Sequence, residues 1–222
     1  MKRRDFSVSA AAAAATAVTA ITASALSFPA LAQPAPFKEG KDYAKLAKPV
    51  PPSAPAGKVD VIEFFWYNCT HCNEFEPSLA RWIATAPKNA HVQRVPVAFN
   101  ASFAAQQKLY YTLEGMGKVD ELHARVFRTI HVERKNLSKE DAIFAWAAAQ
   151  PGMDMAKFKE IYNSFTVSSQ VRRATQLQEA YGVEGVPSIG VAGRYYTDGT
   201  MAGSMPAVLT VVNHLIGLSA KA

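Results

Sequence analysis

The segment from Lys58 to Tyr67, KVDVIEFFWY, constrains the fold more than any other part of this 222-residue chain. It is rich in Val, Ile and aromatic residues, so a strand of this sequence is largely apolar on both faces. Such a strand needs a covering layer on each side, as do the central strands of α/β proteins. The segment therefore predicts a central strand in a sheet that helices cover on both faces.

The only two cysteines of the chain follow this strand directly, in Cys69-Thr70-His71-Cys72. Apolar residues then recur at helical spacing, at Phe75, Leu79, Trp82 and Ile83. The motif is therefore expected where a strand passes into a helix. The next segment, HVQRVPVAF at 91–99, is predicted to be a second strand, which completes a β-α-β unit.

The remainder of the chain consists of a block of predicted helices, followed by two short predicted strands and a final helix. Five helical patterns occur, near 101–115, 118–130, 139–149, 154–165 and 168–181. Two short strands are then predicted at 188–192 and 194–197, and Ser204 is placed to cap a final helix. Strands at both ends with helices between them predict one α/β layer that a helical insertion interrupts.

The amino terminus has the pattern of an export signal. A basic head precedes an uncharged, Ala-rich stretch from Ser7 to Ala32, and small residues stand before Gln33. A transmembrane anchor is the alternative, but the many Ala, Thr and Ser residues favour export and cleavage. Arg3-Arg4 leaves both the twin-arginine and the general secretory routes open. The six prolines between residues 33 and 57 predict an irregular lead-in with room for one short extended piece around Tyr43 to Leu46.

The formal net charge of +6 is weak evidence for a nucleic-acid partner. The signal segment supplies two of these charges, which leaves +4 for the exported part of the chain. No nucleic-acid binding is therefore expected.

The cysteine pair has three interpretations: a redox-active dithiol, a structural disulfide, or half of a metal site. A bridge over two intervening residues removes little unfolded-state entropy, so it stabilises a fold poorly. At a helix start, unpaired N–H groups and the helix dipole favour a Cys69 thiolate, and His71 adds a donor or a positive charge. The pattern favours the redox-active pair.

A structural zinc site would need a second pair of closely spaced ligands. The other histidines are scattered and are expected on the surface or on helix faces: His91, His123, His131 and His214. We expect neither a metal nor a cofactor, because two sulfurs suffice for thiol–disulfide exchange.

Together these features resemble the DsbA-type periplasmic thiol:disulfide oxidoreductases of the thioredoxin superfamily. The resemblance is carried by EGKDY at 39–43, KPV at 48–50, VIEFF at 61–65, the cysteine motif, the helical insertion and GVPS at 185–188. It implies an α/β, thioredoxin-like fold with an inserted helical domain. The expected parts are a cleaved signal peptide (1–32), a lead-in (33–57), a thioredoxin-like domain (58–100 and 183–222) and the helical insertion (101–182).

The resemblance also implies roles for residues outside the motif. Pro187 is expected to follow a cis peptide bond and to face the dithiol, while Val186 offers backbone groups to a substrate strand. Glu63 is expected beneath the dithiol, where it would exchange a proton with Cys72 and pair with Arg94. From the sequence alone, Glu63 would otherwise be a strand-edge residue that points to water.

The predicted site comprises Cys69, Thr70, His71, Cys72 and Glu63. Thr70 stands where several relatives have Pro, and it is expected to tune the oxidant strength of the pair. The implied function is the introduction of disulfides into exported proteins by a periplasmic monomer, which a DsbB-type, quinone-linked membrane oxidase reoxidises. A disulfide isomerase or reductase, and a peptide-binding chaperone with a structural disulfide, are the alternatives.

Overall fold

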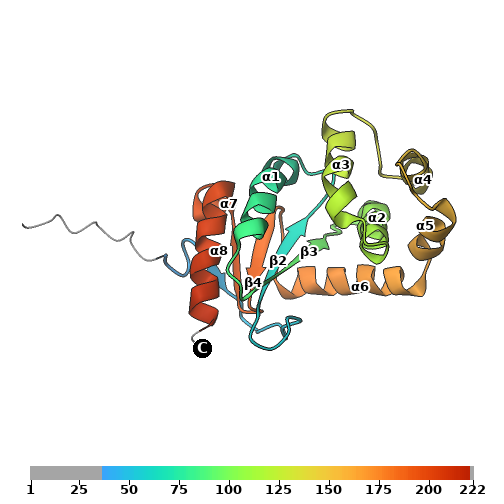
Figure 1. Cartoon of the computed structure of the whole chain (residues 1–222). Helices are drawn as coiled ribbons and strands as arrows, with labels where there is room; N and C mark the ends of the chain where they lie inside the picture. Colours follow the sequence, from blue (N-terminus) through green and yellow to red (C-terminus); the bar gives the residue numbers. More distant parts are fainter. Residues whose placement is uncertain (1–36, 221–222) are drawn as a thin grey trace, which may run out of the picture. The chain divides into compact units, whose positions relative to one another are not determined.

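The computed structural model describes residues 37–220, which fold around a mixed sheet with helices beside it (Figure 1). The strand order in this sheet is β1-β5-β4-β2-β3. The central strand β2 (Val59–Phe65) pairs in parallel with β3 (Ala90–Pro96) and antiparallel with β4 (Ser188–Val191). Strand β5 (Tyr195–Asp198) joins β4 to the two-residue β1 (Ala44–Lys45) at the far edge. The expected thioredoxin-like arrangement is confirmed, whereas the predicted signal peptide lies outside the described residues.

Strand β2 is buried at every position because helices cover both of its faces. On one face, Val59 and Val61 pack with residues of α1 (Thr70–Thr85) and α8 (Met205–Ser219). On the other face, Phe64 packs against Tyr181, which follows α6 (Phe165–Ala180). Because alternate strand residues point to opposite faces, Glu63 lies on the α1 face, between Val61 and Phe65.

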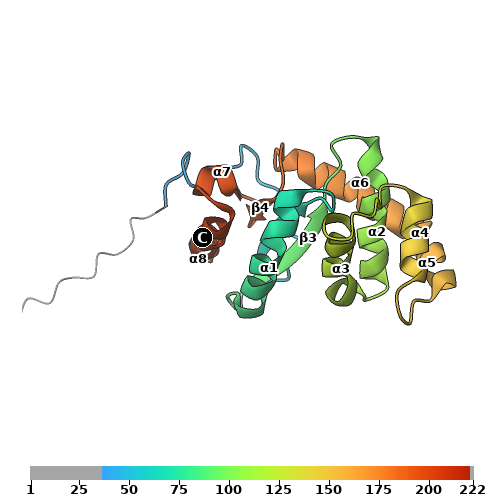
Figure 2. The ribbon, with the colours of Figure 1, turned by 90° about the horizontal axis from the view of Figure 1, so that it is seen from above.

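The helical insertion is present as a block that follows β3 in the chain (Figure 2). It contains a 3-10 turn (Ala101–Phe103), α2 (Ala104–Gly115), α3 (Val119–His131), α4 (Glu140–Ala148), α5 (Met155–Tyr162) and α6. Helix α2 contacts α3, α5 and α6, so it is the central helix of the block. Helix α3 also contacts α1, which brings the insertion against the helix that begins at the cysteine motif.

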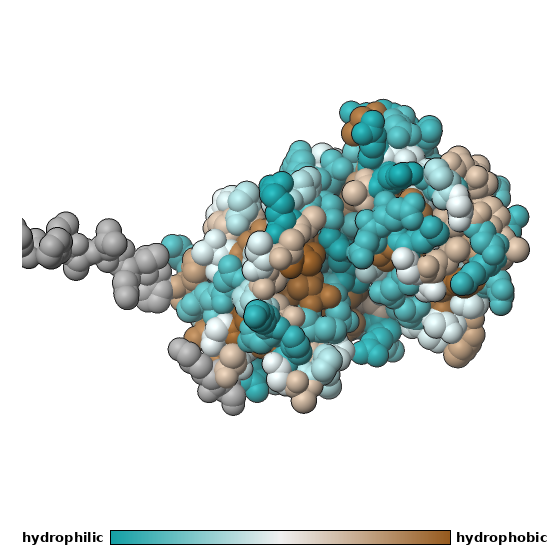
Figure 3. Space-filling model, viewed as in Figure 1, coloured by the Kyte–Doolittle hydropathy of each residue, from teal (hydrophilic) through white to brown (hydrophobic). Residues whose placement is uncertain are grey.

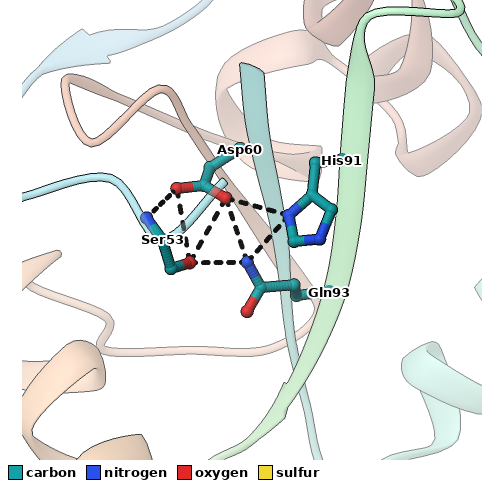
Figure 4. Close-up of polar contacts among 4 residues, drawn as sticks. All are labelled: Ser53, Asp60, His91 and Gln93. Atoms are coloured by element: carbon teal, nitrogen blue, oxygen red, sulfur yellow. Dashed lines mark hydrogen bonds and ion pairs between the residues drawn. The ribbon is translucent and has the colours of Figure 1, made fainter. Parts of the chain in front are cut away.

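The Pro-rich lead-in is attached to the sheet through a buried carboxylate at the beginning of β2 (Figure 4). Asp60 is only 2% exposed, and it accepts hydrogen bonds from the backbone N–H and hydroxyl of Ser53. Gln93 Nε2 donates to the same carboxylate over 2.9 Å, and His91 Nδ1 lies 3.2 Å from it. A buried charge needs such partners, so this cluster holds the lead-in against β2 and β3.

The turn between β4 and β5 also contacts the lead-in, and it requires glycine. Gly193 has φ +65°, its carbonyl accepts from Val50 N–H over 2.7 Å, and an added Cβ would overlap the Val50 carbonyl oxygen. We expect Gly193→Ala to lower the free energy of unfolding by about 2 kcal/mol or more, measured by urea denaturation. The control is Gly57→Ala, with φ +80° and open space, which should cost only about 1 kcal/mol. Equal losses in the two variants would contradict the steric argument.

The described part of the chain ends in two helices, of which the sequence predicted the second. Ser204 caps α8 as predicted, since its hydroxyl accepts from Ala207 N–H. The short helix α7 (Gly199–Ala202) was not predicted, because four residues give no periodicity. Within residues 37–220, no helix is both long and apolar enough to cross a membrane.

The molecular surface is largely hydrophilic in the view of Figure 3, with hydrophobic residues gathered near the middle of that face. Four large apolar residues are exposed within the described part of the chain: Phe99, Val132, Phe165 and Leu218. Single exposed apolar residues of this kind are normal, and they do not by themselves mark a binding site.

Candidate active site

The cysteine pair lies at the start of α1, where β2 ends and the helix begins. Cys69 is the N-cap residue of α1, and its sulfur accepts the backbone N–H of Cys72 over 3.3 Å. No acidic residue occupies the first turn of this helix. The first N–H groups of a helix have no intrahelical acceptor and carry partial positive charge, so this position favours a thiolate.

Both cysteines are free thiols in this structure, and their environments differ sharply. The pKa of Cys69 is lowered to about 6, first by the Cys72 thiol and then by the backbone N–H groups of Cys72 and His71, against the opposing effect of burial. Cys72 is fully buried, and burial raises its pKa far above the ordinary value. The arrangement therefore offers one accessible thiolate and one shielded thiol that keeps its proton.

The loop before β4 faces the first cysteine across the end of the sheet. The Cys69 thiol donates to the carbonyl oxygen of Val186 over 3.3 Å, and the peptide bond between Val186 and Pro187 is cis. A groove of about 350 Å³ adjoins this contact, lined by His71, Gly185, Val186, Pro187, Asp198, Gly199, Thr200 and Met205. Val186 and Cys69, which are 117 positions apart in the chain, thus meet at the Cys69 sulfur.

The two residues between the cysteines are exposed. The side chain of His71 is 76% exposed, and its Nδ1 lies 3.2 Å from Glu74 Oε2. Its backbone N–H and its charge both lower the pKa of Cys69. Thr70 is the first residue of α1 and is exposed.

Glu63 is buried on the α1 face of β2, 1% exposed, and does not point to water. Its Oε2 accepts from Arg94 Nε over 3.1 Å, so the expected contact with Arg94 is present. Burial raises the pKa of Glu63 to about 8, although Arg94 acts in the opposite direction. When Glu63 is ionised, its charge in turn raises the pKa of Cys72.

Sequence reasoning missed two members of this buried cluster, Glu76 and His123. Glu76 Oε1 accepts from Arg94 Nη2 over 2.7 Å, and its Oε2 lies 3.5 Å from Nε2 of His123 on α3. His123 is 3% exposed, so the expectation of a surface or helix-face residue was wrong for this histidine. A signal was present: polar residues interrupt the apolar stripes next to Phe75 on α1 and next to Leu122 on α3.

The insertion also holds the chain just before the motif through direct hydrogen bonds. Gln106 Nε2 on α2 donates to Asn68 Oδ1 over 2.8 Å, and His131 Nε2 on α3 lies 2.8 Å from the Tyr67 carbonyl oxygen. The Tyr67 hydroxyl lies 2.9 Å from Nδ1 of His123. Helices α2 and α3 therefore position the loop that carries Cys69.

A sheet of this topology, with a Cys-x-x-Cys pair at a helix start opposite a proline-containing loop, defines a thiol:disulfide oxidoreductase of the thioredoxin fold. The model of the DSBA-like thioredoxin domain matches residues 88–207. The chain belongs to this DsbA family, and it is a protein disulfide oxidoreductase.

Individual relatives agree over most of the chain. The thiol:disulfide interchange protein DsbA of Bordetella parapertussis is 44% identical over 200 residues, which cover 89% of this chain and 94% of that protein. DsbA of Pseudomonas aeruginosa PAO1 is 38% identical over 83% of this chain and 87% of its own length. The crystal structure of Pseudomonas aeruginosa DsbA superposes with a TM-score of 0.78, at 37% identity, over 83% of this chain and 95% of that one.

The difference between the two thiols predicts their order of alkylation. We expect iodoacetamide to label Cys69 first in the reduced protein, because it is accessible and has the lowered pKa, whereas Cys72 is buried. The labelling rate should rise as the pH increases through about 6, since the thiolate is the reactive form. Peptide mapping after short reaction times measures both. Earlier labelling of Cys72 would reverse the assignment.

Proposed function

We propose that this protein introduces disulfides into exported proteins through the Cys69–Cys72 pair. A substrate thiolate attacks Cys69 Sγ of the oxidised enzyme, the enzyme disulfide breaks, and Cys72 leaves as a thiolate. A second substrate thiolate then attacks the substrate sulfur of the mixed disulfide, and Cys69 leaves as a thiolate. The substrate loses two electrons and the enzyme gains them. The observation that carries this proposal is the lowered pKa of Cys69, because a stabilised thiolate is a good leaving group.

Glu63 is the proposed proton donor and acceptor for Cys72. The Cys72 thiolate that forms in the first step is buried and has a high proton affinity, so it needs a proton at once. Glu63 is buried nearby, and its pKa of about 8 means that it carries a proton at neutral pH. Transfer from Glu63 to Cys72 neutralises the leaving thiolate without water having to enter the site.

Val186 and Pro187 are the proposed substrate-binding residues. An extended substrate segment beside this loop would find the backbone groups of Val186 next to the attacked sulfur. Pro187 offers no N–H of its own, so it adds no competing donor at the dithiol. Thr70 and His71, exposed at the motif, tune the Cys69 thiolate and contact the substrate.

The setting that fits this chemistry is the periplasm. The signal peptide at 1–32 would direct the chain there as a monomer, with reduced exported proteins as substrates and a DsbB-type, quinone-linked membrane oxidase for reoxidation. Thiol–disulfide exchange itself needs no metal or organic cofactor, because the electrons reside in the sulfur bonds.

The equilibrium redox potential against glutathione tests this proposal. A stabilised Cys69 thiolate favours the reduced enzyme, so we expect a potential between about −180 and −120 mV, typical of oxidants and oxidising isomerases. A potential near that of thioredoxin, about −270 mV, would instead indicate a reductant. A disulfide that resists mild reductant altogether would indicate a structural bridge.

A further inference from the structure

Beneath the dithiol, two acidic residues, Glu63 and Glu76, share one cation, Arg94. If both acids were ionised, the cluster would carry a net negative charge. Two carboxylates share one guanidinium, and each accepts a hydrogen bond from a different nitrogen of Arg94. Both carboxylates are at least nine-tenths buried. Since an unpaired buried charge is costly, the cluster is expected to retain one proton. The structure must therefore decide which carboxylate holds that proton.

His123 contacts only one of the two carboxylates. Its Nε2 lies 3.5 Å from Glu76 Oε2, and neither atom has a hydrogen-bond partner elsewhere among the described residues. Its Nδ1 lies 2.9 Å from the Tyr67 hydroxyl, where burial raises the pKa of Tyr67 and so keeps that hydroxyl protonated. If the hydroxyl donates to Nδ1, the ring proton is on Nε2 and points at Glu76. The opposite tautomer would turn a lone pair toward a carboxylate.

We propose that His123, which the helical insertion supplies, is a positioning residue that keeps Glu76 ionised and thereby leaves the exchangeable proton on Glu63. With Glu76 ionised and bound to Arg94, the negative charge of Glu76 acts on Glu63 and disfavours a second carboxylate. The role of that proton in catalysis rests on the proposed function of Glu63. The choice between the two carboxylates is a property of the cluster alone.

The pKa directions of the cluster agree with this geometry. Burial raises the pKa of Glu76, but His123 and Arg94 together lower it by more than burial raises it. The net shift of the Glu76 pKa is therefore downward. Burial lowers the pKa of His123 despite Glu76, which keeps the ring neutral and limits it to the role of a donor. The ionisable groups that contact the His123 ring or act on its charge are Tyr67, Glu76, Arg94 and Tyr110, from four different segments of the chain.

The test is a carboxyl ¹³C NMR titration of the reduced protein labelled at glutamate, with Glu63→Gln and Glu76→Gln used for assignment. His123→Leu removes the donor, whereas His123→Gln retains a side-chain N–H. Thr129→Val is the matched control, because it removes a buried hydrogen bond to Trp146 from the same helix without touching the cluster. In wild type, Glu63 should titrate near pH 8 and Glu76 below its ordinary value.

In His123→Leu we expect the Glu76 midpoint to rise and the Glu63 midpoint to fall, each by about one pKa unit, the size of one hydrogen bond to a charged group. His123→Gln should restore most of the difference, and Thr129→Val should leave both midpoints in place. Unchanged midpoints in His123→Leu, or equal shifts in Thr129→Val, would overturn the proposal.

A second measurement needs no variant and therefore does not depend on whether His123→Leu folds. The ¹⁵N shifts of the His123 ring report its tautomer, and the proposal requires the proton on Nε2 and a bare Nδ1. A proton on Nδ1 would overturn it. Glu63→Gln tests the proposed function separately: an unchanged rate of thiol–disulfide exchange would remove the catalytic role of Glu63, while the NMR results would still decide the role of His123.

Discussion

Replacing Cys72 with Ser is expected to abolish turnover, because without Cys72 the enzyme cannot form the disulfide that a substrate thiolate attacks. Substrate sulfur joined to Cys69 can then no longer be displaced by the neighbouring thiol, because the Ser hydroxyl is a poor nucleophile toward sulfur. Covalent adducts should accumulate on Cys69, visible as slower bands on non-reducing gels and by mass spectrometry after reaction with a mixed-disulfide peptide. Disulfide formation in a reduced, unfolded substrate protein should fall to the uncatalysed background.

The matched variant is Cys69→Ser, which should abolish turnover without forming adducts. The remaining thiol, Cys72, is fully buried and has a strongly raised pKa, so it is both inaccessible and protonated. Adducts on Cys72 in this variant would contradict the division of roles between the two sulfurs. Normal turnover in either variant would remove the dithiol from the mechanism.

Replacing Arg94 with Met is expected to cost about 3–5 kcal/mol of stability at neutral pH, because it leaves the buried Glu76 carboxylate, and the Glu63 carboxyl group beside it, without the cation that they share. Equilibrium urea denaturation at several pH values measures the loss. The exposed Arg172 on α6 provides the control, since Arg172→Met removes a surface cation and should change stability by less than about 0.5 kcal/mol.

The pH dependence of the Arg94→Met variant has a definite sign. Arg94 lowers the pKa of both Glu63 and Glu76, so its removal raises the folded-state pKa of each carboxylate. A carboxyl with a raised folded-state pKa destabilises the fold above its unfolded-state value, and increasingly so as the pH rises toward the folded-state value. The deficit relative to wild type should therefore be larger at pH 8 than at pH 5. Adding Glu63→Gln and Glu76→Gln should recover part of it, and a pH-independent deficit would contradict the charge argument.

Much of the fold could be predicted from local pattern. The apolar segment 58–67 became the buried strand β2, and the five helical patterns between 101 and 182 became α2 to α6. Each of these elements has at least seven residues, which is enough for the requirement to bury apolar side chains to determine its type. The four-residue helix α7 carries too few residues for periodicity to appear, and its conformation depends on its neighbours, whereas the two-residue β1 lies where a short extended piece was expected.

The active site likewise has one part that the sequence predicted and one part that it did not. The sequence by itself determined that two thiols stand at a strand-to-helix junction, because the spacing and the local helix signals are contained in one short segment. It did not reveal that Glu76 and His123 join Glu63 and Arg94 in one buried cluster.

That cluster arises only when α1, α3, β2 and β3 pack together. A lone His or Glu in a helical stripe has the same local pattern whether it meets water or an opposite charge. Only the tertiary structure determines the partners and the ionisation of Glu76 and His123. Burial and the distance to a partner set the ionisation of such groups, and both depend on how segments far apart in the chain pack together.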